Sequence, residues 1–165
     1  MRLSRRWALS ALFCLVGALQ ARSAPPAAGE GTVPVRSPKM QKAVDLVAGD
    51  YQKTVEPLFQ VSCFDCHSNA TRYPWYHSIP GVGWWIDHDV REARGHLDMS
   101  EGFPFRGKGH MKNRLKAIAH LVDTGDMPPL DYRIMHRGSG LTPQQKQAVE
   151  DWVQRSLDRL ENAED

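Results

Sequence analysis

The chain has 165 residues, of which 24% are charged and 41% are hydrophobic. This length and composition are typical of one compact domain with a short additional segment. Its formal net charge of +2 arises at the N-terminal end, because Arg2, Arg5, Arg6 and Arg22 precede residue 24 and no acidic residue does. Without residues 1–23 the basic residues fall from 21 to 17 against 19 acidic ones, a net charge near −2. The remaining chain therefore offers no basic face for nucleic acid.

Residues 1–23 have the layout of a secretory signal peptide. Arginines come first, an apolar run follows from Trp7 to Leu19, and small residues stand at Ala21 and Ser23, after either of which cleavage fits. The apolar run is shorter than the roughly 20 residues that span a membrane. We therefore predict a cleaved leader, with an uncleaved membrane anchor as the alternative.

A linker and a first helix follow the leader. Residues 24–38 are mostly small residues and prolines without an apolar period, which predicts a flexible linker. Residues 39–165 are predicted to form the folded domain. Its first helix is predicted over residues 39–59, where apolar side chains recur at three- and four-residue spacings. Pro57 either ends this helix or separates it from a short turn.

The middle of the domain is predicted to be largely loop. Residues 68–107 are rich in aromatic residues, glycine and proline, and only a short helix over about residues 83–94 is expected there. A longer helix is predicted over residues 110–123, with its apolar side chains on one face. It should end at Gly125, a residue suited to a left-handed helix cap.

The last helix has the clearest start signal. Thr142 and Gln145 form a T-x-x-Q capping box, and Pro143 suits the first turn. Its apolar stripe comprises Val149, Trp152, Val153, Leu157 and Leu160. Strand-like alternation is confined to a few residues at a time, so the predicted fold class is all-α.

A Cys-x-x-Cys-His motif carries the chemistry of the sequence. Cys63 and Cys66 are three residues apart, so each thiol can add across one vinyl group of a haem, and the imidazole of His67 can then bind the iron. In bacteria such attachment takes place outside the inner membrane, so the motif and the leader both indicate the periplasm. We predict one covalent haem c, with Cys63 and Cys66 as anchors and His67 as the proximal iron ligand.

Three other interpretations of the cysteine pair are weaker. Structural zinc needs a second pair of thiolates or suitably spaced histidines, and no second cysteine pair exists. A thioredoxin-like dithiol needs a strand–helix–strand context, which the sequence lacks. A disulfide across two intervening residues would brace very little of the chain.

The sixth iron ligand must come from another segment. Met127 is the best candidate, because it follows a helix end at Gly125 and precedes the stiff Pro128-Pro129 pair. A methionine side chain is flexible, and such a segment would hold it in place. Its alternative role is packing in the core. His88 is the second candidate, and bis-histidine ligation would give a lower reduction potential than histidine–methionine ligation.

Aromatic residues follow the motif closely. Tyr73 and Trp75 lie within the run Tyr-Pro-Trp-Tyr at 73–76, and Trp84 follows eight residues later. An aromatic shell around a haem limits solvent access and raises the reduction potential. We predict that Tyr73, Trp75 and Trp84 form part of the haem-pocket wall.

Several stretches together carry a resemblance to a known family. They are the run from Cys63 to Tyr76 (CxxCH-S-N-x-T-x-Y-P-W-Y), Trp84-Trp85 with His88, Gly125 to Pro129, Leu141-Thr142 and Trp152. Over about residues 40–160 the chain resembles secreted bacterial haem-binding domains that are cytochrome c-like. The resemblance implies one c-type haem on Cys63, Cys66 and His67, with Met127 as distal ligand. It also implies that the first and last helices pack across each other, whereas Met99 to Gly109 departs from the pattern.

Two classes of function are compatible with such a site. A six-coordinate iron has no open position for a substrate and suits a periplasmic electron carrier that docks with a redox partner protein. A haem enzyme of the peroxidase type, or a haem-based sensor or docking module, would instead need an open or displaceable sixth site. We predict the electron carrier rather than an enzyme.

Overall fold

The computed structural model describes residues 36–164, and within them the fold is all-α, as predicted. Most of the predicted linker and the whole predicted leader lie outside these residues. The elements are α1 (Pro38–Thr54), α2 (Glu56–Ser62), α3 (Phe64–His67), η1 (Trp75–Ser78), α4 (Val82–His96), β1 (Leu97–Asp98), β2 (Arg106–Gly107), α5 (Met111–Thr124), α6 (Leu130–Met135) and α7 (Pro143–Glu161). No helix in residues 36–164 is both long and apolar enough to cross a membrane.

The first and last helices begin at signals that are local in sequence. Ser37 caps α1 by accepting a hydrogen bond from the Met40 amide (3.1 Å), so the helix begins one residue before the predicted boundary. The predicted capping box of α7 is present, since Thr142 and Gln145 bond each other's backbone amides. Pro57 lies in the first turn of α2 and separates it from α1. It therefore divides the predicted 39–59 helix into two.

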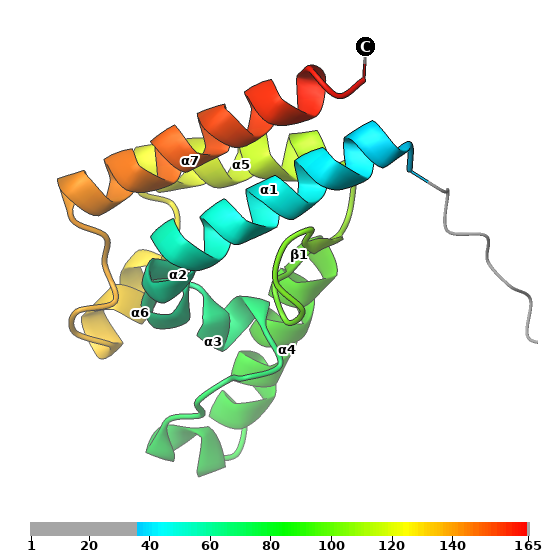
Figure 1. Ribbon diagram of the computed structural model, residues 1–165. Helices are drawn as coiled ribbons and strands as arrows, with labels where there is room; N and C mark the ends of the chain where they lie inside the picture. The colour runs from blue at the N-terminus through cyan, green and yellow to red at the C-terminus, as the bar shows by residue number, and fades with distance from the viewer. Residues whose placement is uncertain (1–35, 165) are drawn as a thin grey trace, which may run out of the picture. The chain divides into compact units, whose positions relative to one another are not determined.

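Helices α1, α5 and α7 form one layer of the domain. In Figure 1, α7 lies against α1 and α5, while α3 and α4 lie on the other side of α1. The predicted packing of the first helix on the last is thus confirmed. Helix α5 ends at Gly125, whose φ of 78° is left-handed as predicted.

An aromatic cluster joins these helices. Trp152 of α7 lies with its ring centroid 5.6 Å from that of Tyr51 on α1 and 6.2 Å from that of Phe59 on α2. Phe103 and Phe105 complete the cluster, and all five rings are buried. Stacked and edge-to-face rings of this kind stabilise a core beyond the area that they bury.

The unusual segment 99–109 contributes to this core. It contains β2 and the connection from β1 to β2, and it buries Met99, Phe103 and Phe105. Leu97 pairs with Gly107, where a Cβ atom would collide with the His96 carbonyl oxygen. Gly107 also has a φ of 126°, so only glycine permits this close approach to the backbone of His96 and Leu97.

An ion pair between α1 and α7 makes the stability of the domain sensitive to acid. Burial raises the pKa of Asp50, but hydrogen bonds from Arg159 (2.9 Å) and Arg155 (3.2 Å) outweigh burial and hold it below its ordinary value of 3.8. The pair therefore stabilises the fold above pH 3.8, and this contribution is lost as the pH falls through the lowered pKa.

We expect Asp50→Asn to lower the free energy of unfolding by about 0.5–1 kcal/mol at pH 7, a modest value because the arginines are partly exposed. The difference from the wild type should shrink below pH 3.8. Urea denaturation at both pH values measures it. Asp45→Asn is the control, since Asp45 lies on the same helix and accepts a hydrogen bond from Gln41 instead. Equal effects of the two substitutions would contradict the prediction.

Candidate cofactor site

One turn of helix brings the Cys-x-x-Cys-His residues together. Cys63 ends α2 and begins α3, and its carbonyl oxygen accepts hydrogen bonds from the amides of Cys66 (3.2 Å) and His67 (2.9 Å). The turn ends at Ser68, whose hydroxyl and amide both donate to the Phe64 carbonyl. Both cysteines and His67 consequently line the same cavity.

A backbone carbonyl of β1 holds the Nδ1 side of the His67 imidazole. Its Nδ1 lies 2.8 Å from the carbonyl oxygen of Leu97, the first residue of β1, and the His67 carbonyl accepts from the Met99 amide (2.7 Å). With the proton on Nδ1, the ring donates to Leu97, and Nε2 keeps a lone pair for a metal. Burial lowers the pKa of His67, which favours this neutral form.

The cysteines have the character of protonated thiols. Burial raises the pKa of Cys63 to about 12 and that of Cys66 to about 11. Reactive dithiols have lowered pKa values instead, so this environment argues against a thioredoxin-like exchange. Within residues 36–164 no group of three or more histidine, cysteine or acidic side chains is arranged to hold a metal ion.

The cavity has a volume of about 990 Å³, which is at the upper end for a cofactor site. Side chains of α2 to α6 and of the segments between them form its wall, and apolar residues from several of these helices line it. They include Phe59, Val90, Ile118, Leu121 and Val122. A cavity of this size and character suits a flat, largely apolar cofactor.

Met127 lies in the wall of the same cavity, together with Pro128 and Pro129. Its amide donates to the Leu121 carbonyl of α5 (3.1 Å), which fixes the segment just after the Gly125 turn. The peptide between Met127 and Pro128 is cis, and Pro129 precedes α6. The structure thus brings the proposed distal residue into the cavity that holds Cys63, Cys66 and His67.

The structure places one of the three residues predicted for the aromatic wall at the cavity. Tyr73 lines the cavity, but Trp75 and Trp84 are 81% and 71% exposed and lie outside its wall. Tyr76 and Trp85 line it in their place. Adjacent residues of a helix point in different directions, so one tryptophan of the 84–85 pair faces the cavity and the other faces solvent.

His88 also lies away from the cavity. Its ring packs on Trp84 with the centroids 5.8 Å apart, and its side chain is 46% exposed. The histidines that line the cavity besides His67 are His96 and His136, neither of which was the predicted second candidate for the sixth iron ligand. Helical spacing places His88 on the outer face beside Trp84, because residues four apart share a face.

A buried carboxylate between the two cysteines was also missed. Asp65 is 8% exposed and accepts hydrogen bonds from the Arg72 amide (3.1 Å) and Nε (3.0 Å), and from the Tyr132 hydroxyl (2.7 Å). Burial raises the pKa of Asp65, but these hydrogen bonds outweigh it and lower the pKa below its ordinary value. An acidic residue inside the motif was the only sequence signal for this arrangement.

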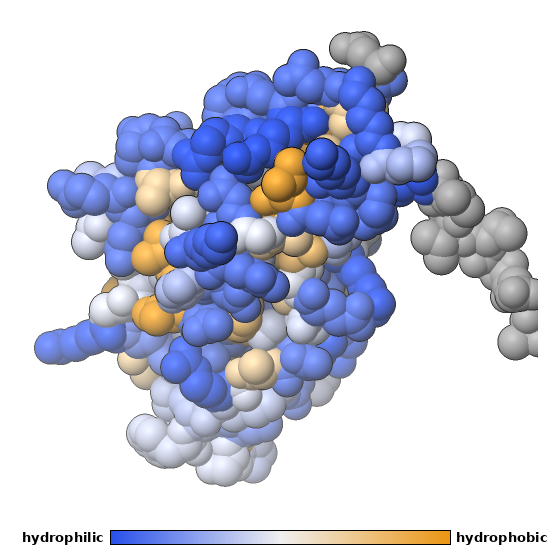
Figure 2. Space-filling model, in the orientation of Figure 1, coloured by the Kyte–Doolittle hydropathy of each residue, from blue (hydrophilic) through white to orange (hydrophobic). Residues whose placement is uncertain are grey.

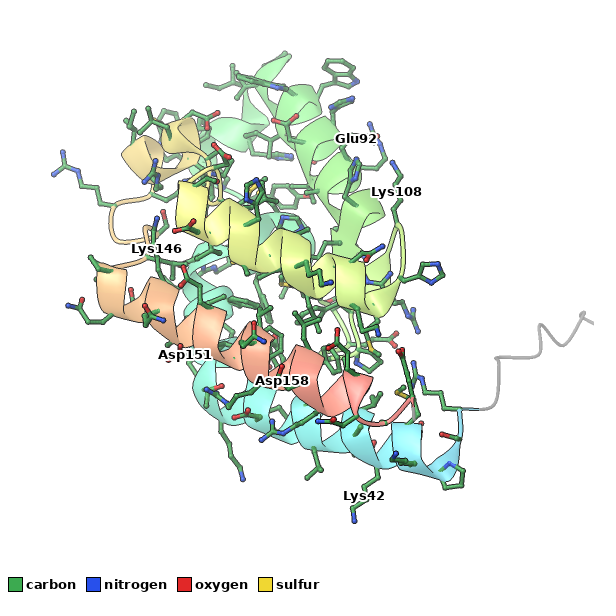
Figure 3. All side chains as sticks on the ribbon, turned by 90° about the horizontal axis from the view of Figure 1, so that it is seen from above. Lys42, Glu92, Lys108, Lys146, Asp151 and Asp158 are labelled. Atoms are coloured by element: carbon green, nitrogen blue, oxygen red, sulfur yellow. The ribbon has the colours of Figure 1, made fainter. Side chains whose placement is uncertain are left out.

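Two cations lie at one rim of the cavity. Lys108 and Arg114 both line it, and neither forms an ion pair within the described part of the chain. The Arg114 Nη1 donates to the Gly107 carbonyl (3.1 Å), while its buried Nε has no partner there. Figure 3 shows Lys108 on the same edge of the molecule as Glu92 of α4. This rim suits the carboxylates of a ligand bound in the cavity.

An all-α domain whose apolar cavity presents two neighbouring thiols, a held imidazole and a thioether has the donor set of a haem-binding protein. The chain belongs to the haem-binding domain family, whose model matches residues 32–155, more than half of the sequence. No curated protein and no solved structure matches the chain significantly. The family match establishes haem binding, and the resemblance seen in the sequence is confirmed.

Proposed function

We propose that this chain is a periplasmic monohaem c-type cytochrome that transfers electrons, with His67 and Met127 as the two axial iron ligands. One observation carries the proposal. Cys63, Cys66 and His67 line a single apolar cavity together with Met127, which comes from a segment 60 residues further along the chain. A haem-binding domain with a covalent motif and two axial donors in one cavity suits a tightly held, six-coordinate haem.

Different residues of the cavity would hold different parts of the haem. Cys63 and Cys66 would anchor it through thioethers to its two vinyl groups, and the pair of thiols suits one haem. Lys108 and Arg114 would receive its carboxylates, because both cations at the rim are without acidic partners in the described residues. Haem, when bound, supplies a one-electron couple between ferric and ferrous iron.

His67 and Met127 would set the properties of that couple. The Leu97 carbonyl orients the His67 ring and increases its basicity as a ligand. The apolar wall keeps water from the site, and a thioether ligand raises the potential relative to a second histidine. With both axial positions filled, the protein offers no site for a substrate, and its partner would be a redox protein in the same compartment.

An open sixth site is the alternative, and one observation supports it. His96 and His136 line the cavity and would be available as acid or base groups if Met127 were displaced. A peroxidase-type enzyme or a haem-based sensor would need such an arrangement. The two proposals differ in whether an external ligand reaches the iron.

Carbon monoxide tests the proposal directly. The full chain should be produced in a bacterial host with its haem-attachment apparatus and recovered from the periplasm. We expect one haem per chain that survives denaturation, and a reduced spectrum that carbon monoxide leaves unchanged at neutral pH. A spectrum that shifts readily with carbon monoxide would support the enzyme or sensor instead. A protein retained without haem in the cytoplasm would contradict both the cofactor and the compartment.

A further inference from the structure

The carboxylate inside the haem motif is bonded to the segment that follows Met127. The Tyr132 hydroxyl of α6 donates to Asp65 Oδ2 (2.7 Å) across 67 residues of sequence. Arg72 satisfies the rest of the carboxylate, because its Nε donates to Oδ1 (3.0 Å) and its Nη2 to Oδ2 (3.2 Å). Asp65 therefore joins the covalent anchor of the cofactor to the distal side of the cavity.

Few other interactions hold α6 in place. The helix buries none of its residues, and Leu130, Ile134 and Met135 are each at least 60% exposed. Apolar burial is the main force that fastens helices to a domain, and α6 has little of it. A hydrogen bond to a buried, charged carboxylate is correspondingly important for the position of this helix.

The segment between the two fixed points is short and stiff. Met127 is bonded through its amide to Leu121 of α5, and Tyr132 lies only five residues further on. Two of the intervening residues are prolines, whose φ angles are restricted. The positions of Leu121 and Asp65 thus determine where the Met127 side chain lies in the cavity.

Tyr132 is well suited to remain a donor. Burial and the hydrogen bond to Asp65 raise its pKa above the ordinary value, so the hydroxyl keeps its proton at any physiological pH. Its ring also stacks on His136 with the centroids 4.1 Å apart. Removal of the hydroxyl alone would leave this stacking in place.

We propose that Tyr132 is a positioning residue that, by its hydrogen bond to Asp65, holds Met127 over the haem and keeps the sixth iron position closed to external ligands. The inference rests on the proposed function, because it assumes that Met127 is the distal ligand. A thioether is a weak ligand on a flexible side chain, so its occupancy depends on the segment that carries it. Loss of the hydrogen bond shifts the balance toward an open site.

Tyr132→Phe in the covalent holoprotein tests the inference. We expect the affinity of the ferric protein for imidazole, and of the ferrous protein for carbon monoxide, to rise about tenfold, as the loss of a hydrogen bond to a charged group implies. Methionine bound to ferric haem iron gives a near-infrared charge-transfer band, called here the methionine band. This band should weaken in parallel. Tyr51→Phe is the matched control, because the Tyr51 hydroxyl is buried outside the cavity wall and has no hydrogen-bond partner within the described residues.

Hydrogen exchange of the Met127 amide gives a second readout that does not depend on the iron ligand. It should quicken in Tyr132→Phe, while exchange in α7 stays unchanged. Unchanged ligand affinities with only a lower urea midpoint would overturn the inference, since the bond would then stabilise the fold alone. If the wild type lacks the methionine band, the proposed ligation fails. Unchanged Met127 exchange in Tyr132→Phe would then overturn the positioning role as well, and faster exchange would support it.

Discussion

Replacement of both Cys63 and Cys66 by alanine is expected to abolish covalent haem attachment. The two thiols are separated by one helical turn and line the same cavity, so the pair is placed to add to the two vinyl groups of one haem. Each single substitution should leave one thioether and a weaker attachment. Haem staining of a denaturing gel, together with the intact mass of the protein, measures the effect.

A control for this experiment lies in the predicted leader. Cys14 is the one other cysteine in the sequence, and it belongs to the apolar run of the predicted signal peptide. Cys14→Ala should leave the haem content of the exported protein unchanged. Haem that survives denaturation in the Cys63→Ala, Cys66→Ala double variant would contradict the proposed anchors.

Met127→Ala is expected to open the sixth iron position completely. The thioether of Met127 is the donor proposed to lie opposite His67, and alanine provides none in its place. The near-infrared methionine charge-transfer band should disappear, the reduced protein should bind carbon monoxide at neutral pH, and the reduction potential should fall. Absorption spectra and a redox titration of the holoprotein measure the three changes.

Met135→Ala is the matched control for Met127→Ala. Met135 also lines the cavity, but it lies on α6 and its side chain is largely exposed. Its loss should leave the methionine band intact. If the band persists in Met127→Ala and is lost in Met135→Ala, the assignment moves to Met135. If the wild type shows no methionine band, His96 and His136 become the candidates, because both line the cavity and His88 does not.

One end of the molecule has a less hydrophilic surface than the rest of the domain (Figure 2). In Figure 2 the end of the molecule formed by η1 and the first turns of α4 is nearly white, whereas the helices above it are mostly blue. Trp75, Trp84 and Trp85 are all exposed there, and Trp85 also lines the cavity. Trp75 and Trp84, the two tryptophans predicted for the pocket wall, are therefore surface residues.

Interactions between near neighbours in the chain could be predicted from the sequence. The capping box of α7, the left-handed Gly125 and the turn that holds Cys63, Cys66 and His67 all involve residues within about four positions of one another. Their geometry depends on the local backbone, which residue type and spacing largely determine. The same holds for the all-α class, because the apolar spacing of each helix is local.

Features that depend on distant segments could not be predicted in this way. The Leu97 carbonyl that orients His67 lies 30 residues away, and the Tyr132 hydroxyl that binds Asp65 lies 67 residues away. Burial of Phe103 and Phe105, and the outward orientation of Trp84 and His88, likewise depend on how α4 and the strand pair pack on the other helices.

The sequence by itself thus determined the cofactor motif, the fold class and the cap signals at Thr142 and Gly125. The tertiary structure alone decided which side chains line the cavity and how His67 and the Met127 segment are held. The physical reason is that a donor and acceptor far apart in the chain meet only when the helices that carry them have packed, and packing depends on all the apolar faces together.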